Sequence, residues 1–395
     1  MRILTLIVAV VMVISCGNAG PQEGLVDTGQ ASAIAEPVTV GYDMAEAGVG
    51  WLELVASGAD DATIREAFFR DVAPTAGCQA IIHHWERFRE WDEEIFYDFI
   101  LEALERKPSD KPLVGEDGQP TVAGHSRRLW LNAVGDVDQL RRNLEALQAI
   151  DVRAVALAKA RRYLPVEADV SNQFHVVLFG ASGAFSVGDE NGFDLFQLKL
   201  LPDGAIDVEW VIDLFAHEIH HSGFSSAMAQ HLGAAGDDDR IMLPGVLVAE
   251  GMATYYTTPP FPELEAWRAS DDPVEQGLAA DWDSHLANMP AIYVQAELDI
   301  ALGLEGGLTT DDLMKRWLGG MQGPAYGLGV DMIRIIDTEL GTDAAVNLAR
   351  DSRQLLKTYN RAARQVRDDG REAYLFETAL ADRLAEFELR AEEEE

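Results

Sequence analysis

The chain has 395 residues, of which 48% are apolar and 25% are charged, and its formal net charge at pH 7 is −36. The apolar fraction excludes an intrinsically disordered protein, and the length allows one large domain or two to three ordinary ones. The charge excludes further classes, because a surface this acidic repels phosphate backbones and anionic lipid headgroups. We therefore expect no nucleic-acid binding and no polybasic contact with a membrane.

The first residues resemble a bacterial export signal. Arg2 supplies a positive charge, and the apolar run at residues 3–14 is too short to span a bilayer as a helix. The run leads into VISCG at residues 13–17, which resembles the lipobox of bacterial lipoproteins, where a cysteine becomes the lipidated N-terminus. The alternative is an ordinary secretory signal with an incidental cysteine.

This resemblance implies a signal peptide at residues 1–15 and lipid on Cys16, with export and anchoring at the periplasmic or extracellular face of a bacterial membrane. Residues 16–40 are rich in small and polar residues without periodicity, which is typical of a flexible tether. Since charge opposes the bilayer, we expect membrane contact only through the N-terminal lipid. Cys78 is then left without a partner, and we interpret it as a small buried residue, with a reactive thiol as the alternative.

The rest of the chain is predicted to be mainly helical. Between residues 41 and 165 apolar residues recur three or four positions apart, which predicts a helical N-terminal region. The period then changes, and residues 173–180 and 192–198 are predicted to form two strands separated by a connection rich in Gly and Asp. Helical patterning returns at about Val208 and continues to an acidic tail. The pattern predicts an α+β fold, mainly α, with a small sheet.

The helix expected after these strands contains the motif His-Glu-x-x-His, formed by His217, Glu218 and His221. Positions four apart lie about 40° apart around a helix, so the two imidazoles project from one face and can meet at one metal ion. Catalytic zinc takes three protein ligands and keeps a water molecule in the fourth position. Glu218 lies near the same face, where its carboxylate can take a proton from that water. We expect Gly223 to end the helix just after the last histidine.

A third ligand is expected from residues 243–256, an apolar segment predicted to be helical. Its only charged residue is Glu250. A lone carboxylate among apolar residues is costly to bury unless a positive partner such as zinc compensates its charge. The alternative for Glu250 is an exposed position that caps a turn.

Together these motifs resemble those of a known class of enzyme. Two strands, a His-Glu-x-x-His helix and a second helix with Glu-Gly-x-Ala resemble a gluzincin-type zinc metallopeptidase. They are also similar to bacterial families of zinc-dependent peptidases of unknown function, in which a Tyr-x-x-Gly segment follows later. That segment fits YGLG at residues 326–329, ahead of another helix. The resemblance spans about residues 172–342.

The resemblance implies a zincin-like catalytic region at residues 166–342, embedded in the helical region before it and in C-terminal helices at residues 343–395. It implies one zinc bound by His217, His221 and Glu250, with Glu218 as the general base. It also implies an upstream strand that aligns a peptide substrate by β-augmentation.

One departure from the thermolysin-like pattern concerns the residue that orients a zinc ligand. Those gluzincins carry Asn-Glu-x-x-x-Asp, whereas Thr254 stands at the position of the Asp here. Asp213, one turn before His217 on the same helix face, is our candidate for that orienting role. The alternative for Asp213 is an ordinary solvated helix residue.

An oxyanion stabiliser is also expected beside the metal. Tyr326 is our candidate, because Tyr255 and Tyr256 point away from Glu250 if their helix continues. Core packing is the alternative interpretation of Tyr326.

These features favour a zinc-dependent peptidase that acts on a peptide or protein substrate by metal-activated water. One alternative is a non-catalytic binding or structural lipoprotein that keeps a gluzincin-like zinc site. A structural zinc site is usually closed by a fourth Cys or His and would have no use for Glu218. A zinc amidase or esterase is the other alternative, since the same four residues would serve it.

Overall fold

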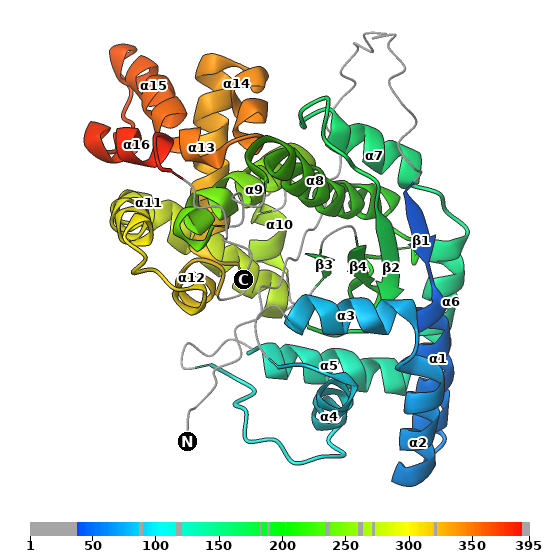
Figure 1. Ribbon diagram of the computed structural model, residues 1–395. Coiled ribbons are helices and arrows are strands. Elements are labelled where there is room, and N and C mark those ends of the chain that lie inside the picture. Colours follow the sequence, from blue (N-terminus) through cyan, green and yellow to red (C-terminus); the bar gives the residue numbers. More distant parts are fainter. Residues whose placement is uncertain are drawn as a thin grey trace.

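The computed structural model in Figure 1 describes residues 38–86, 90–115, 121–181, 183–187, 190–201, 203–233, 238–259, 264–270, 273–319 and 322–388. The predicted signal, Cys16 and nearly all of the predicted tether lie outside these ranges. Within them, no helix has both the length and the apolar character needed to cross a membrane.

The predicted fold class is confirmed: helices dominate, and the described strands form one small mixed sheet. The strands are β1 (Thr39–Gly41), β2 (Gln173–Val177), β3 (Ala184–Val187) and β4 (Glu190–Asp194). Their order in the sheet is β1-β2-β4-β3, with β1 and β4 parallel to β2 and β3 antiparallel to β4. β2 and β4 correspond to the two predicted strands. β3 lies in the predicted connection, and β1 begins inside the predicted tether.

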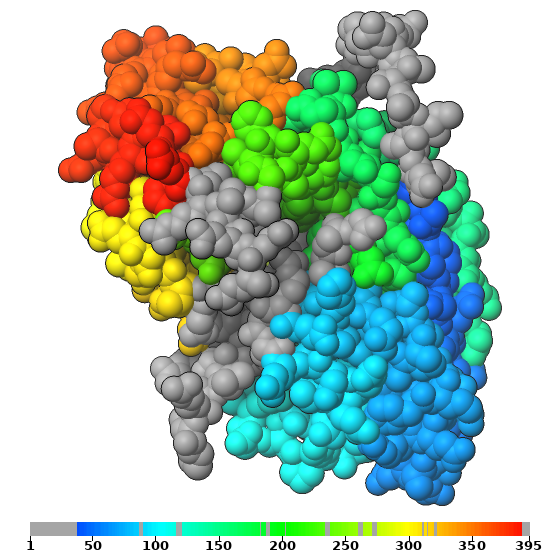
Figure 2. All heavy atoms as spheres, viewed as in Figure 1, coloured from blue at the N-terminus to red at the C-terminus, as the bar shows by residue number. Residues whose placement is uncertain are grey.

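Helices fill the chain between β1 and β2 and again after β4. The N-terminal ones are α1 (Asp43–Ala56), α2 (Asp61–Ala67), α3 (Ala76–Glu86), α4 (Glu93–Ala103), α5 (Val122–Gly135), α6 (Val137–Gln148) and α7 (Arg153–Arg161). The later ones are α8 (Val208–Leu232), α9 (Met242–Thr257), α10 (Leu264–Ala269), α11 (Pro273–Leu304), α12 (Thr310–Trp317), α13 (Pro324–Leu340), α14 (Thr342–Val346), α15 (Leu355–Asp368) and α16 (Thr378–Ala385). Figure 2 shows the first helices and the last helices on opposite flanks, with the middle of the chain between them.

Both faces of the sheet are covered, as Figure 1 shows, by α8 on one side and α3 on the other. Successive side chains of a strand point to opposite faces. Phe174 of β2 stacks on Phe215 of α8 with ring centroids 4.2 Å apart, and Phe193 of β4 packs edge-on against the same ring. The next residue of β2, His175, faces Gly77 of α3 instead. Helix α8 therefore packs on the apolar side chains of one face of the sheet.

Cys78 on α3 is a free, fully buried cysteine, as expected for a small core residue. Burial raises the pKa of its thiol to about 12. Since the thiolate is the reactive form, this residue stays protonated and inert at neutral pH.

The prediction that Gly223 ends the motif helix is wrong, because α8 continues to Leu232. The glycine serves packing instead: a Cβ at this position would lie 2.3 Å from Leu164 Cδ1 and 2.9 Å from Val170 Cγ1. Its missing side chain lets the segment before β2 pack directly on α8. The beginning of α8 is as predicted, where the Asp207 side chain accepts a hydrogen bond from the backbone N–H of Trp210 at 3.1 Å.

Helices α9 and α13 pack so closely that their backbones touch. A Cβ on Gly251 would lie 2.5 Å from the carbonyl carbon of Gly329, and a Cβ on Gly329 would lie 2.5 Å from the carbonyl oxygen of Leu247. Only glycine permits this approach at either position. The contact holds Glu250, next to Gly251, near the first turn of α13.

We expect Gly251→Ala to lower the free energy of unfolding by about 1–3 kcal/mol, because the new methyl group forces two backbones apart. Gly50→Ala is the matched control, since Gly50 is exposed on α1 with no atom within 4 Å of a new Cβ. The control should raise stability by about 0.5–1 kcal/mol through helix propensity alone. Denaturant unfolding measures both, and a stabilised Gly251→Ala would contradict the close contact.

Candidate metal centre

The motif helix α8 is buried on more than one side, which places ionisable residues in the protein interior. His217 is fully buried and Glu218 is 2% exposed. His220 is also buried, but its Nε2 lies 3.2 Å from the carbonyl oxygen of Tyr163. Burial lowers the pKa of His220 to about 3, so it is a neutral residue of the core.

Three donor atoms from α8 and α9 converge on one point. His217 Nε2 and His221 Nε2 are 3.0 Å apart, and Glu250 Oε2 lies 3.5 Å from His221 Nε2 and 3.7 Å from His217 Nε2. Among the described residues, these are the ones that form a group able to hold a metal ion. The structure thus brings together the three residues that the sequence singled out as ligands.

The spacing fits a transition metal such as zinc. The point equidistant from the three atoms lies about 2.0 Å from each, close to the usual zinc–nitrogen and zinc–oxygen distances. Glu250 Oε2 is also a buried oxygen without a hydrogen-bond partner among the described residues. A buried carboxylate oxygen rarely stays unpaired, so a cation at this point would satisfy it.

Glu250 and His221 each stabilise the charged form of the other. Burial works to raise the pKa of the Glu250 carboxyl, but the two imidazoles beside it hold that pKa well below its usual range. Burial likewise opposes protonation of His221, yet the charge of Glu250 raises the pKa of His221 to about 9. Glu250 therefore stays ionised, and its negative charge is compensated by the protonated His221 or by a metal ion that takes the place of that proton.

Glu218 lies beside this triad in a different environment. Burial raises the pKa of its carboxyl to about 7, an effect that His221 opposes and Glu250 adds to. It is not part of the group of donor atoms that converge among the described residues.

His217 is oriented by a residue that sequence reasoning missed. Its Nδ1 lies 3.0 Å from the hydroxyl oxygen of Thr258, the residue that caps the C-terminus of α9. In the tautomer that suits this contact, Nδ1–H donates to the hydroxyl and the Nε2 lone pair is left for a metal. The candidate for this role, Asp213, is instead paired with Lys159 of α7. Thr254 stands where the thermolysin-like pattern has an Asp. The hydroxyl that contacts His217 lies one turn further along the chain, on Thr258.

We expect Thr258→Val, which keeps the shape and removes the hydroxyl, to weaken zinc binding by about 10- to 100-fold. Thr254→Val is the matched control, because the Thr254 hydroxyl is buried on the same helix and has no hydrogen-bond partner in the part of the chain that the structure describes. Competition with a chromogenic chelator measures both affinities. Equal affinities for the two variants would show that Thr258 does not support the metal.

Tyr326 lies on the first turn of α13 and is 2% exposed. Burial raises the pKa of its phenol well above the usual range, and the charges of Glu250 and Glu218 add to the rise. Its hydroxyl therefore stays protonated, as a hydrogen-bond donor must. The other tyrosines that we considered bind elsewhere, since Tyr255 and Tyr256 both donate to Asp337 at 3.3 and 3.0 Å.

A buried polar chain anchors α8 beside the triad. Asn191 of β4 donates to Asn172, which donates to the hydroxyl of Ser222 at 2.6 Å. Ser222 follows His221 directly and donates to the carbonyl oxygen of Glu218 at 3.4 Å. The chain thus connects the sheet to the turn of α8 that carries the motif. No motif marks these residues in the sequence, because the contact depends on how β2, β4 and α8 pack.

Comparison with known families identifies the class of protein. The family described as "Putative zinc dependent peptidase (DUF5700)" matches residues 110–368. The chain belongs to this family. The match includes α8, α9 and α13, so every residue of the candidate metal centre lies inside the matched region. Searches of the curated proteins and of the solved structures find no match.

Proposed function

We propose that this chain is a gluzincin-type zinc peptidase in which His217, His221 and Glu250 hold one zinc and Glu218 is the general base. The observation that carries the proposal is the convergence of three donor atoms at zinc-binding distances, with a buried carboxylate beside them. Membership in a family described as zinc-dependent peptidases supports the reaction class.

The residues around the triad have separate tasks in this mechanism. Zinc, when bound, polarises the scissile carbonyl and makes water nucleophilic near neutral pH. Glu218 accepts a proton from the attacking water and returns it to the leaving amine. Thr258 holds the ring of His217 in place, and the protonated hydroxyl of Tyr326 donates to the developing oxyanion.

The sheet meets the motif helix through β3, which ends the described sheet, pairs with β4 and contacts α8. Backbone groups of β3 also have partners inside the chain, since the carbonyl oxygen of Ser186 lies 3.3 Å from His84 Nδ1. The preference for a peptide over an ester substrate therefore rests on the family match and not on an open strand edge.

The composition of the site favours catalysis over a structural zinc. A structural site is normally closed by a fourth Cys or His, whereas the described group has three members and leaves one position for water. Glu218 would have no role in a purely structural site.

The proposed function is tested by cleavage of a broad peptide library. The purified protein should contain near one zinc per chain, lose cleavage when a chelator removes the metal, and regain it when zinc is restored. Cleavage that survives metal removal would reject the proposal. Cleavage of esters or non-peptide amides alone would favour the amidase or esterase alternative.

We also propose that the protein is exported and anchored through lipid on Cys16, as its N-terminal sequence suggests. In bacteria that process lipoproteins, Cys16→Ser should move the protein from the membrane fraction to the soluble fraction with its peptidase activity retained. Membrane fractionation measures the shift. A variant that stays with the membrane would exclude lipid on Cys16 as the anchor.

A further inference from the structure

A cavity of about 510 Å³ is lined by the end of α4, the start of α5 and the connection between them. Figure 1 shows these two helices on the other side of the sheet from α8. This volume is within the range of small-molecule sites. The lining residues that matter here are Phe99, Glu102, Glu105, Lys111, Ser126 and Arg127. None of them belongs to the candidate metal centre, since they lie on α4, on α5 and in the connection between these two helices.

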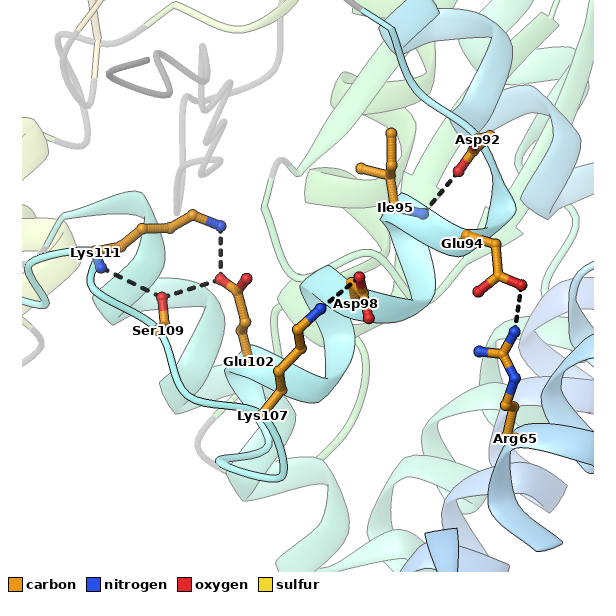
Figure 3. A network of polar contacts seen from close by, with 9 residues as sticks. All are labelled: Arg65, Asp92, Glu94, Ile95, Asp98, Glu102, Lys107, Ser109 and Lys111. Carbon is orange, nitrogen blue, oxygen red and sulfur yellow. Dashed lines mark hydrogen bonds and ion pairs between the residues drawn. The ribbon is translucent and has the colours of Figure 1, made fainter. Parts of the chain in front are cut away.

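The cavity presents charges of both signs. Lys111 Nζ lies 2.7 Å from Glu102 Oε2, which also accepts a hydrogen bond from Ser109 at 3.0 Å, as Figure 3 shows. Arg127 pairs with Glu105. The cavity wall thus holds two acid–base pairs, each partly open to solvent.

Two further cations of the lining are held by acids outside it. Lys107 lies 2.5 Å from Asp98, a pair visible in Figure 3, and Arg106 lies 2.7 Å from Asp61. The two pairs inside the cavity are therefore the charges that a ligand would meet.

Ser126 supplies a hydrogen-bonding group without a partner. It is 1% exposed, it lines the cavity, and its hydroxyl has no hydrogen bond among the described residues. Buried hydroxyls are normally satisfied, so an orphaned one at a cavity wall indicates a ligand that can bond to it.

Glu105 adds a backbone feature at the same wall. Among the described residues it is the one non-glycine residue with a positive φ, at 58°. It follows the end of α4, where the N–H of Arg106 bonds to the carbonyl oxygen of Leu101 at 2.9 Å, an arrangement that favours glycine at Glu105. A glutamate here is less stable than glycine would be, and such strain is common at binding sites.

We propose that this cavity binds a small zwitterion, a free amino acid or a peptide of two or three residues. Its carboxylate would pair with Arg127 and Lys111, its ammonium with Glu105 and Glu102, and an apolar side chain would lie against Phe99. An anion that took both bases would leave the two glutamates without a partner, and a cation that took both acids would leave Lys111 and Arg127 without one. Because partly exposed ion pairs contribute little to stability, a ligand with both charges replaces them readily. The site is independent of the metal centre and of the proposed peptidase function.

The test uses the full chain carrying Glu218→Gln, so that no peptide is consumed, and isothermal titration with leucine and leucyl-leucine. At least one should bind, and blocking its amine by acetylation or its carboxylate by amidation should weaken binding at least 10-fold. Arg127→Met and Glu105→Gln should each weaken it about 10-fold, and Ser126→Ala several-fold. Glu105→Gly should weaken binding while raising the unfolding midpoint, a combination that a purely structural role would not give.

Arg141→Met and Glu53→Gln are the controls, since they remove an exposed ion pair elsewhere on the surface, and they should leave affinity unchanged. The same affinity is expected after chelation, which separates this site from the metal centre. The proposal is overturned if neither ligand binds at millimolar concentration, if blocked ligands bind equally well, or if Arg127→Met binds like the parent.

Discussion

Glu218→Gln is expected to lower kcat for peptide cleavage by roughly 10²–10⁴-fold, the range typical of a lost general base, while near one zinc per chain stays bound. The amide has the shape of the carboxylate but cannot accept a proton from water. Because Glu218 lies outside the group of converging donors, its replacement leaves the metal ligands unchanged. Steady-state kinetics on a cleaved library peptide and zinc content by mass spectrometry measure the two effects.

Glu209→Gln is the matched control, since Glu209 is an exposed acid on the first turn of the same helix. It changes the charge of α8 equally and should leave kcat close to that of the unmodified protein. Full activity in Glu218→Gln would exclude the general-base role. Loss of zinc from Glu218→Gln would instead make Glu218 a ligand.

Glu250→Ala is expected to weaken zinc binding by more than the 10- to 100-fold typical of removing an orienting partner, because it removes a ligand itself. Peptide cleavage at limiting zinc should fall to background. Chelator competition measures the affinity, and thermal unfolding without zinc confirms that the variant is folded.

Glu250→Gln separates loss of charge from loss of the ligand atom. The amide oxygen can still approach the metal but carries no charge, so its zinc affinity should lie between those of the unmodified protein and Glu250→Ala. Equal affinity in all three proteins would show that Glu250 does not bind the metal. A folded Glu250→Ala that keeps its zinc would lead to the same conclusion.

Local signals in the sequence predict much of the fold. The change of period after residue 165 predicts β2 and β4, and the apolar segment at residues 243–256 becomes α9 nearly residue for residue. β3 was not predicted, because four residues carry too little periodicity and its pairing with β4 decides its conformation. The prediction for Gly223 is wrong because glycine also occurs where a helix packs closely against another segment, and the sequence does not distinguish this from a helix end.

At the candidate metal centre, too, local sequence signals identify some residues, and tertiary packing alone determines others. His217 and His221 share a helix turn, so their proximity follows from spacing alone, and Glu250 stands out as the one charge of an apolar segment. Thr258 gives no such signal, because its contact with His217 joins the end of α9 to the middle of α8 across 41 positions. Helix spacing favours Asp213, but the packing of α7 on α8 places Lys159 against its carboxylate.

The contact between Gly251 and Gly329 limits which positions can change in relatives of this protein. It fixes Glu250 and the turn of Tyr326 relative to each other through main-chain atoms, not through side chains that mutation can exchange. Outward-facing positions of α9 and α13 are therefore free to vary without moving either residue. We expect relatives that cleave different peptides to keep this glycine pair while the side chains around it change.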